Sequence, residues 1–191
     1  KYLHRHFILH KPYGYLSQFV NNQNRRKNKS LLGELYDFPE GTMAIGRLDE
    51  TSEGLLCLST DGKVSEHIRS RNVEEEYYVQ VDGIITNEAI IQLQKGVEIG
   101  FEGKKYTTKP CKAHLVSSVS HLPLAKRKVR DPRHGPKSWV SITVTEGKFR
   151  QIRKMTAAAG FPTLRLVRVR IGITKLTIKS GEVIEVEQLN P

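Results

Sequence analysis

The sequence predicts an α+β fold, with a mostly antiparallel mixed sheet and flanking helices. Two observations support this. Residues 77–81, 139–145 and 164–171 alternate apolar with polar side chains, as half-buried strands do. Helical patterns at 61–69 and 87–94 fall between such segments. Mixed strands and helices joined by irregular meanders are typical of an antiparallel sheet with helices on it.

The first half of the chain gives local start and stop signals for each element. Residues 2–9 alternate as a strand, and Pro12 and Gly14 end it. Ser30 can cap a short helix at 31–36, and Asp61 can open the helix at 61–69. Short apolar strands at 43–45 and 55–58 flank a polar loop at 46–54, and the strand at 77–81 precedes the helix at 87–94.

The second half is richer in strands. Turn residues separate three short strands. Residues 121–137 contain three prolines and are expected to form a basic arm or loop. Gly160 is a typical C-terminal end for a helix. The predicted elements are strands at 97–99, 105–107, 110–116, 139–145, 164–171, 175–178 and 183–186, and a helix at 149–159.

Length and composition fit an ordinary globular protein. The 191 residues suit one domain or two closely joined subdomains. No apolar run approaches the ~20 residues of a membrane span, and the first residues do not form a signal peptide. Cys57 and Cys111 lack metal-binding spacing, which favours reduced thiols. We expect a cytoplasmic protein, or an organellar one if a targeting segment has been removed.

The net charge of +11 is concentrated in three segments. Residues 24–29 and 148–170 carry four and seven Lys or Arg and no acid, and residues 121–137 carry six against Asp131. Segmental positive charge is the expected footprint of a phosphate-backbone partner, although solvated basic faces would give the same composition.

Two segments have residues suited to chemistry. Gly46 and Gly54 bracket a loop with Arg47 and Asp49, where a carboxylate between two strands can be held rigidly. The same residues also fit a solvated acidic turn. On the helix that follows Glu146, side chains three apart share a face, which holds two guanidinium groups able to bind anions, those of Arg150 and Arg153.

The tyrosines and histidines give weaker evidence for a functional site. Tyr77 and Tyr78 point to opposite faces of a strand, so that one can pack inward and the other can face a cleft. The seven histidines show no metal-ligand spacing, and no nucleotide-binding fingerprint is present. We expect no metal and no cofactor.

Four segments in order resemble the pseudouridine synthases of the bacterial branch that modifies small- and large-subunit ribosomal RNA. Two are Lys11-Pro12-Tyr13-Gly14 and Gly46-Arg47-Leu48-Asp49, the second continuing through Ser59-Thr60-Asp61-Gly62. The others are Glu76 to Gly83 and Glu146 to Met155, the latter accompanied by Leu164 to Arg168. The match covers nearly the whole chain. The strand from Tyr77 and the segment from Phe161 are most similar to the large-subunit enzymes that lack a small N-terminal RNA-binding module.

The resemblance implies a fold and an activity. Residues 1–191 would form one catalytic domain, with two interlocked subdomains either side of a central basic cleft and no N-terminal RNA-binding module. In view of the similarity above, a specific uridine of large-subunit RNA would be flipped into that cleft and isomerised to pseudouridine without a cofactor. We expect ribosomal RNA as the partner, no membrane association and a monomer.

The resemblance also assigns roles to residues. Asp49 would be the catalytic carboxylate, Tyr77 would stack on the base and transfer a proton, and Arg153 would pair with Asp49 and keep it ionised. Arg47 would help the nucleotide out of its stack. The remaining candidate RNA contacts are Lys11, Arg150, Arg165, Arg168, Lys126, Arg127, Lys128 and Arg130.

The sequence departs from the family pattern at three positions. Glu75 stands where lysine is common, which puts the local charge in question, and His10 and Ser52 replace a usual Asn and Thr. Two other hypotheses remain: a non-catalytic RNA-binding or ribosome-assembly protein, which would not need Asp49, and a metal-dependent nuclease. The nuclease needs a carboxylate cluster, and near Asp49 only Glu50 and Glu53 could supply it.

Overall fold

The computed structural model describes residues 3–20 and 30–191. The chain divides into two compact units. The first contains Lys1–Val73, Leu122–Ala125 and Arg168–Pro191, and the second contains Glu74–His121 and Lys126–Val167. The predicted α+β class with antiparallel strand pairing is confirmed.

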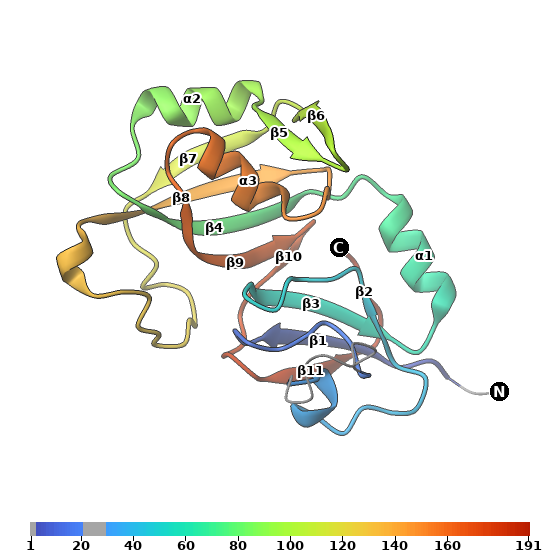
Figure 1. The fold of residues 1–191 in the computed structure, drawn as a ribbon. Helices are drawn as coiled ribbons and strands as arrows, with labels where there is room; N and C mark the ends of the chain where they lie inside the picture. The colour runs from blue at the N-terminus through green and yellow to red at the C-terminus, as the bar shows by residue number, and fades with distance from the viewer. Residues whose placement is uncertain (1–2, 21–29) are drawn as a thin grey trace. The chain divides into compact units, whose positions relative to one another are not determined.

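The first unit is built on antiparallel strands. Strand β1 (His6–Lys11) lies between β11 (Val183–Val186) and β3 (Glu53–Ser59), and β2 (Met43–Ile45) pairs with β3. Helix α1 (Gly62–Ser70) lies against β2 and β3 (Figure 1). The Asp61 side chain caps this helix by accepting a hydrogen bond from the Lys63 backbone NH, which the sequence predicted.

Apolar side chains on one side of β1 and β3 form the core of the first unit. Phe7, Leu9, Leu56 and Leu58 are buried together with Leu32. Leu32 begins the 3₁₀ helix η1 (Leu32–Glu34), which is shorter than the helix predicted at 31–36. Its cap is Leu31 and not the predicted Ser30.

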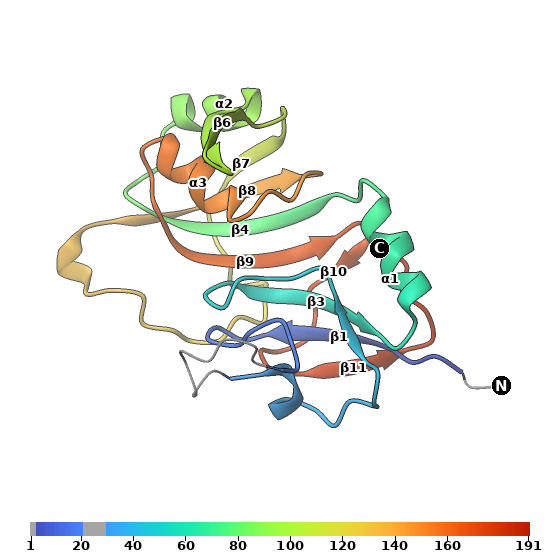
Figure 2. The same ribbon diagram turned by 45° about the vertical axis from the view of Figure 1, so that its right-hand side comes forward.

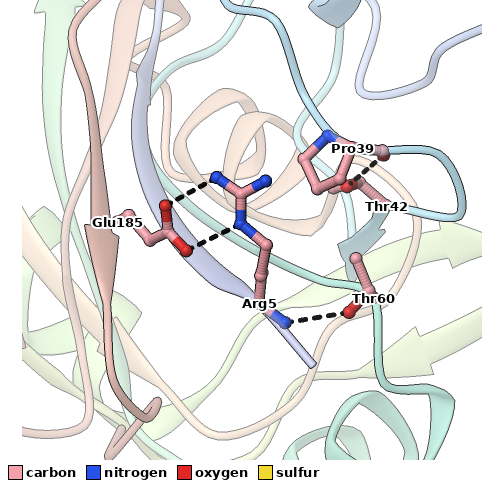
Figure 3. Close-up of polar contacts among 5 residues, drawn as sticks. All are labelled: Arg5, Pro39, Thr42, Thr60 and Glu185. Carbon is pink, nitrogen blue, oxygen red and sulfur yellow. Dashed lines mark hydrogen bonds and ion pairs between the residues drawn. The ribbon is translucent and has the colours of Figure 1, made fainter. Parts of the chain in front are cut away.

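An ion pair between Arg5 and Glu185 connects the residue before β1 to β11. The Arg5 guanidinium donates two 2.8 Å hydrogen bonds to the Glu185 carboxylate, and the Arg5 backbone NH donates to Thr60 Oγ1 (Figure 3). The hydrogen bonds from the Arg5 guanidinium hold the pKa of Glu185 below its usual value. In the turn before β2, the Thr42 hydroxyl donates to the Pro39 carbonyl (Figure 3).

The second unit pairs its strands in the order β4-β8-β7. Both of these pairs are antiparallel, and β4 (Glu75–Asp82) and β8 (Lys137–Val144) pair along their whole length. Strand β7 (Lys112–Val116) packs against α2 (Asn87–Lys95), and β5 (Glu98–Phe101) forms a hairpin with β6 (Lys104–Thr107). Helix α3 (Gln151–Ala158) lies beside β5 (Figure 1).

The core of the second unit is centred on β4 and β8. Val79, Val81, Val140 and Ile142 from β4 and β8 are fully buried, and Leu93 and Met155 bring α2 and α3 onto them.

The predicted basic arm, residues 121–137, connects β7 to β8 and contains the short helix η2 (Pro132–His134) (Figure 2).

Strand β9 (Thr163–Ile171) supplies residues to both units, since the division falls between Val167 and Arg168. In the first unit its C-terminal part pairs with β10 (Thr174–Lys175). Cys57 and Cys111 do not take part in a disulfide, and burial raises the pKa of Cys111 to about 11. None of the helices within the described ranges has the length and apolar composition that a membrane crossing requires.

Gly54 marks a close approach of two strands in the first unit. Its φ is +112°, and a Cβ atom there would lie 2.2 Å from the Arg168 carbonyl oxygen and 2.7 Å from the Arg168 nitrogen. Backbone cannot move aside as a flexible side chain can, so no other residue fits here without displacing a strand.

We therefore expect Gly54→Ala to lower the free energy of unfolding by about 3 kcal/mol. The control is Gly62→Ala at the start of α1, where the nearest atom to a new Cβ is Met43 Cε at 3.9 Å. This control should be neutral or stabilise by up to about 1 kcal/mol. Urea denaturation of both variants measures the difference, and equal midpoints would contradict the steric argument.

Candidate functional site

Asp49 lies in the loop between β2 and β3, where the sequence predicted it. The two strands are antiparallel neighbours, so the loop must turn back between them. Gly46 begins this turn with a φ of +70°, a conformation that glycine adopts without strain. The Asp49 side chain is half-buried, whereas Arg47 is exposed.

Hydrogen bonds fix this loop on both sides of Asp49. Ser17 Oγ donates to the Leu48 carbonyl at 2.7 Å and accepts from the Leu48 NH at 2.9 Å. The Glu50 carbonyl accepts from the Gly14 NH at 2.8 Å, and the Ser52 NH donates to the Asp49 carbonyl at 3.0 Å. The backbone that carries the carboxylate is therefore held in one conformation, as a reacting group requires.

Lys11 is buried beneath this loop. Its ammonium donates to the carbonyls of Pro12, Tyr15 and Glu50, at 2.9, 2.7 and 3.4 Å. Burial lowers the pKa of Lys11 to about 7, although the nearby carboxylates of Glu53, Glu50 and Asp49 act in the opposite direction. The amine therefore faces the protein interior, which differs from the RNA contact predicted for it.

Arg168 is another predicted RNA contact in this unit, and it too is buried. Its Nε donates to the Leu55 carbonyl at 2.9 Å, and its charge acts on Lys11 and contributes to the lowered pKa of that amine. The structure thus brings Asp49, Lys11 and Arg168 together in the first unit.

Tyr77 lies on β4 in the second unit, opposite Ile142 of β8. Its hydroxyl donates a 2.7 Å hydrogen bond to Glu75 Oε2, two residues earlier on the same face of the strand. Glu75 therefore orients the Tyr77 hydroxyl. Tyr78 points to the other face, and its ring lies 6.0 Å from that of His121.

Arg150 and Arg153 lie at the beginning of α3. The helix begins at Gln151 and not at Phe149 as predicted, because Arg150 is in the left-handed region with a φ of 53°. Gln151 receives a hydrogen bond from the Lys148 NH at its side-chain oxygen and donates its own NH to the Lys148 carbonyl. Arg150 is exposed and Arg153 is half-buried.

The loop before α3 is attached to the β5–β6 hairpin. The Glu146 carboxylate accepts hydrogen bonds from the Tyr106 hydroxyl and, at 2.7 Å, from the Lys109 backbone NH. The Lys148 ammonium lies 5.1 Å from the ring centroids of both Phe101 and Tyr106, within range of a cation–π interaction. These contacts hold the conformation from which the two arginines project.

The remaining predicted RNA contacts differ in exposure. Lys126 and Lys128 are exposed on the basic arm, Arg127 is half-buried, and Arg165 is buried on β9. Arg130 binds Asp82 and two backbone carbonyls of the protein itself. The basic segment at 24–29, also predicted to bind RNA, lies outside the described residues.

Three residues that shape these sites were not identified from the sequence: Ser17, Glu75 as the partner of Tyr77, and Asp82. Ser17 and Asp82 contact residues 31 and 48 positions away, and no local pattern signals such contacts. Glu75 could have been found, because side chains two apart on a strand share a face. Within the described ranges, no group of three or more His, Cys, Asp and Glu residues is placed to hold a metal ion.

Comparisons with known proteins agree on one family. A family model described as RNA pseudouridylate synthase matches residues 5–158. Ribosomal large subunit pseudouridine synthase E of Xanthomonas axonopodis pv. citri is 38% identical over 171 residues, which cover 88% of this chain and 86% of the relative. The protein of the same name from Vibrio parahaemolyticus is 36% identical over 185 residues, which cover 94% and 73%.

Solved structures show the same fold. A crystal structure of a pseudouridylate synthase has a TM-score of 0.73 and 24% identity, and the match covers 96% of this chain and 70% of that one. Human RNA pseudouridylate synthase domain containing 1 has a TM-score of 0.56 and 19% identity, with 98% and 80% covered. The segment from Lys11 to Arg153, which carries Asp49 and Tyr77, lies inside the range of the family model, and the chain belongs to the RNA pseudouridylate synthase family.

Proposed function

We propose that this protein isomerises one uridine of large-subunit ribosomal RNA to pseudouridine. The observation that carries the proposal is the rigidly held Asp49 loop, in a chain that belongs to this family. The names of the relatives that match at 36–38% identity support the large subunit as the target. We further propose that the protein acts as a monomer in the cytoplasm.

The reaction rearranges bonds within one nucleotide. The bond from N1 of uracil to C1′ of ribose breaks, the base turns, and a bond from C5 to C1′ forms. The proton on C5 leaves and N1 gains one, so no atoms and no electrons are added overall. Asp49 supplies the carboxylate for cleavage and rejoining, and the loop geometry presents it without a change of backbone conformation.

The other assigned residues retain their roles as part of this proposal, with two exceptions. Tyr77 would stack on the base and transfer the proton, Arg153 would act with the carboxylate, and Arg47 would assist the flipped nucleotide. Lys126, Arg127, Lys128, Arg150, Arg165 and Arg168 would contact RNA. Lys11 and Arg130 are omitted, because their cationic groups are occupied by acceptors inside the protein.

A non-catalytic RNA-binding protein is the second candidate, favoured only by the positive charge. Such a protein would not need a carboxylate held in place by backbone hydrogen bonds, and activity of the wild-type protein distinguishes the two. Pseudouridine mapping of ribosomal RNA from cells with and without the gene tests this directly. An identical set of modified sites in both would contradict the proposed function.

We expect Asp49→Asn to lower the rate of pseudouridine formation by about a thousandfold or more while RNA binding persists. The matched control is Glu50→Gln, which removes one negative charge from the same loop and keeps the Glu50 carbonyl that Gly14 and Lys11 bind. Complementation of cells lacking the gene, followed by pseudouridine mapping, measures both. If Asp49→Asn restores the missing site, the catalytic assignment is wrong.

Tyr77→Phe should lower turnover by about a hundredfold, because it removes the hydroxyl that would transfer a proton and keeps the ring that would stack. Affinity for RNA should stay within about twofold of wild type. Tyr78→Phe on the opposite face is the control, and Glu75→Gln reports the contribution of the hydrogen bond to Tyr77. Single-turnover rates and filter binding separate the two quantities. Unchanged turnover of Tyr77→Phe rules out the proton role.

Binding to RNA should weaken steeply as salt increases, because the basic arm displaces condensed counterions. Replacing both Lys126 and Lys128 by alanine should reduce the slope of log affinity against log salt by about two. Replacing Lys63 and Lys95, two exposed lysines outside the basic segments, should leave the slope unchanged. Titrations at several salt concentrations measure it, and equal slopes for both double variants would exclude the arm as a phosphate contact.

A further inference from the structure

Arg130 uses its guanidinium group inside the protein. Nη1 donates to Asp82 Oδ1 at 2.8 Å, and Nη2 donates to the carbonyls of Gly135 and Pro136 at 3.1 and 2.8 Å. The side chain is 14% exposed, whereas that of its neighbour Arg133 is 90% exposed. The guanidinium of Arg133 is therefore exposed to solvent, whereas that of Arg130 donates its hydrogen bonds to acceptors within the second unit.

These bonds close the C-terminal end of the basic arm into a loop. Arg130 binds carbonyls five and six residues ahead of it, and η2 fills the interval. Asp131 caps η2 by accepting a 2.9 Å hydrogen bond from the Arg133 NH. Gly135 completes the turn with a φ of +105°. The loop therefore has a defined conformation at its base.

The closed loop is also attached to the end of β4. The Pro136 carbonyl that binds Arg130 accepts a second hydrogen bond from the Gly83 NH at 2.9 Å. Ser138 Oγ donates to the Gly83 carbonyl at 2.7 Å and accepts from the Ile85 NH at 2.9 Å. Asp82 itself is held through its backbone NH, which donates to the Pro162 carbonyl. All of these residues belong to the second unit.

We propose that Arg130 and Asp82 form a latch that positions the basic arm for RNA, and that Arg130 is not itself a phosphate ligand. The latch fixes one end of the arm, and Lys126 and Lys128 then present their charges from an ordered base. An ordered segment loses less conformational entropy on binding than a mobile one, so a latched arm binds RNA more tightly. This inference rests on the proposed RNA-modifying function.

The latch predicts that removing Asp82 changes RNA affinity in the direction opposite to the one expected from its charge. Removing an acid from a protein that binds RNA ordinarily strengthens binding or leaves it unchanged, because the anion repels phosphate. Asp82→Ala should instead weaken RNA binding by about tenfold, because it releases the arm. Glu88→Ala, which removes an exposed acid in the first turn of α2, is the matched control and should bind as wild type or more tightly.

Two further variants separate a latch from a direct contact. Arg130→Lys keeps the charge but replaces the two separate Nη donors, one on Asp82 and one on the carbonyls, by a single nitrogen. A latch is then weakened as in Asp82→Ala, whereas a phosphate contact would be retained. The double variant Asp82→Ala/Arg130→Ala should be no weaker than either single variant, since both remove the same interaction. In all of them KM for RNA should rise and kcat should stay near the wild-type value.

Limited proteolysis gives a readout that does not depend on RNA. Trypsin should cut after Lys126 and Lys128 several times faster in Asp82→Ala than in wild type or Glu88→Ala. If Asp82→Ala does not fold, Asp82→Asn takes its place with a smaller expected effect. A wild-type protein that fails to modify RNA contradicts the proposed function and leaves the proteolysis result to test the latch. Unchanged cleavage, or tighter RNA binding by Asp82→Ala, would overturn the latch.

Discussion

The loop that carries Asp49 depends on the buried ammonium group of Lys11. Removing a charge from water costs several kcal/mol per ion unless polar groups replace the lost hydration, and here three backbone carbonyls do so. Two of them belong to the segment after β1 and one to the Asp49 loop, so a single side chain ties these segments together. Lys11 pairs with Gly54 across β1 and β3, and the Arg168 backbone lies close against Gly54. The close approach of the strands and the hydrogen bonds of the Lys11 ammonium therefore constrain the same few residues.

The second unit orders its candidate residues by other means. The loop before α3 is held at its surface, where Glu146 accepts two hydrogen bonds from the neighbouring hairpin segment and Lys148 lies over two aromatic rings. These contacts support Arg150 in a left-handed conformation that a non-glycine residue adopts only under tertiary constraint. Glu75 restrains the Tyr77 hydroxyl in the same local way. Substitutions in this unit thus act on a site through surface contacts as well as through the core.

Local sequence signals predicted those parts of the fold that depend on local interactions. Helix α2 was placed within one residue of its observed end, since Thr86 caps it and Gly96 terminates it. The strand at 43–45 was located at its observed bounds. Charge alone was a poor guide to individual cations: Lys11 and Arg130 were both predicted to bind RNA, and their partners are carbonyls and a carboxylate fixed by tertiary structure. The residue type suggested a phosphate partner, and only the fold could show that the cation was already occupied.

The division of β9 limits how this chain can be taken apart. The first unit is assembled from three separate segments and the second from two, and the strand from Thr163 to Ile171 contributes to each. No single cut releases either unit with all of its residues, and a cut beside Arg168 would sever a strand. Exchange of modules between family members, or a split version reassembled from two fragments, would therefore have to keep this strand whole. In this chain, neither compact unit is encoded by one continuous segment.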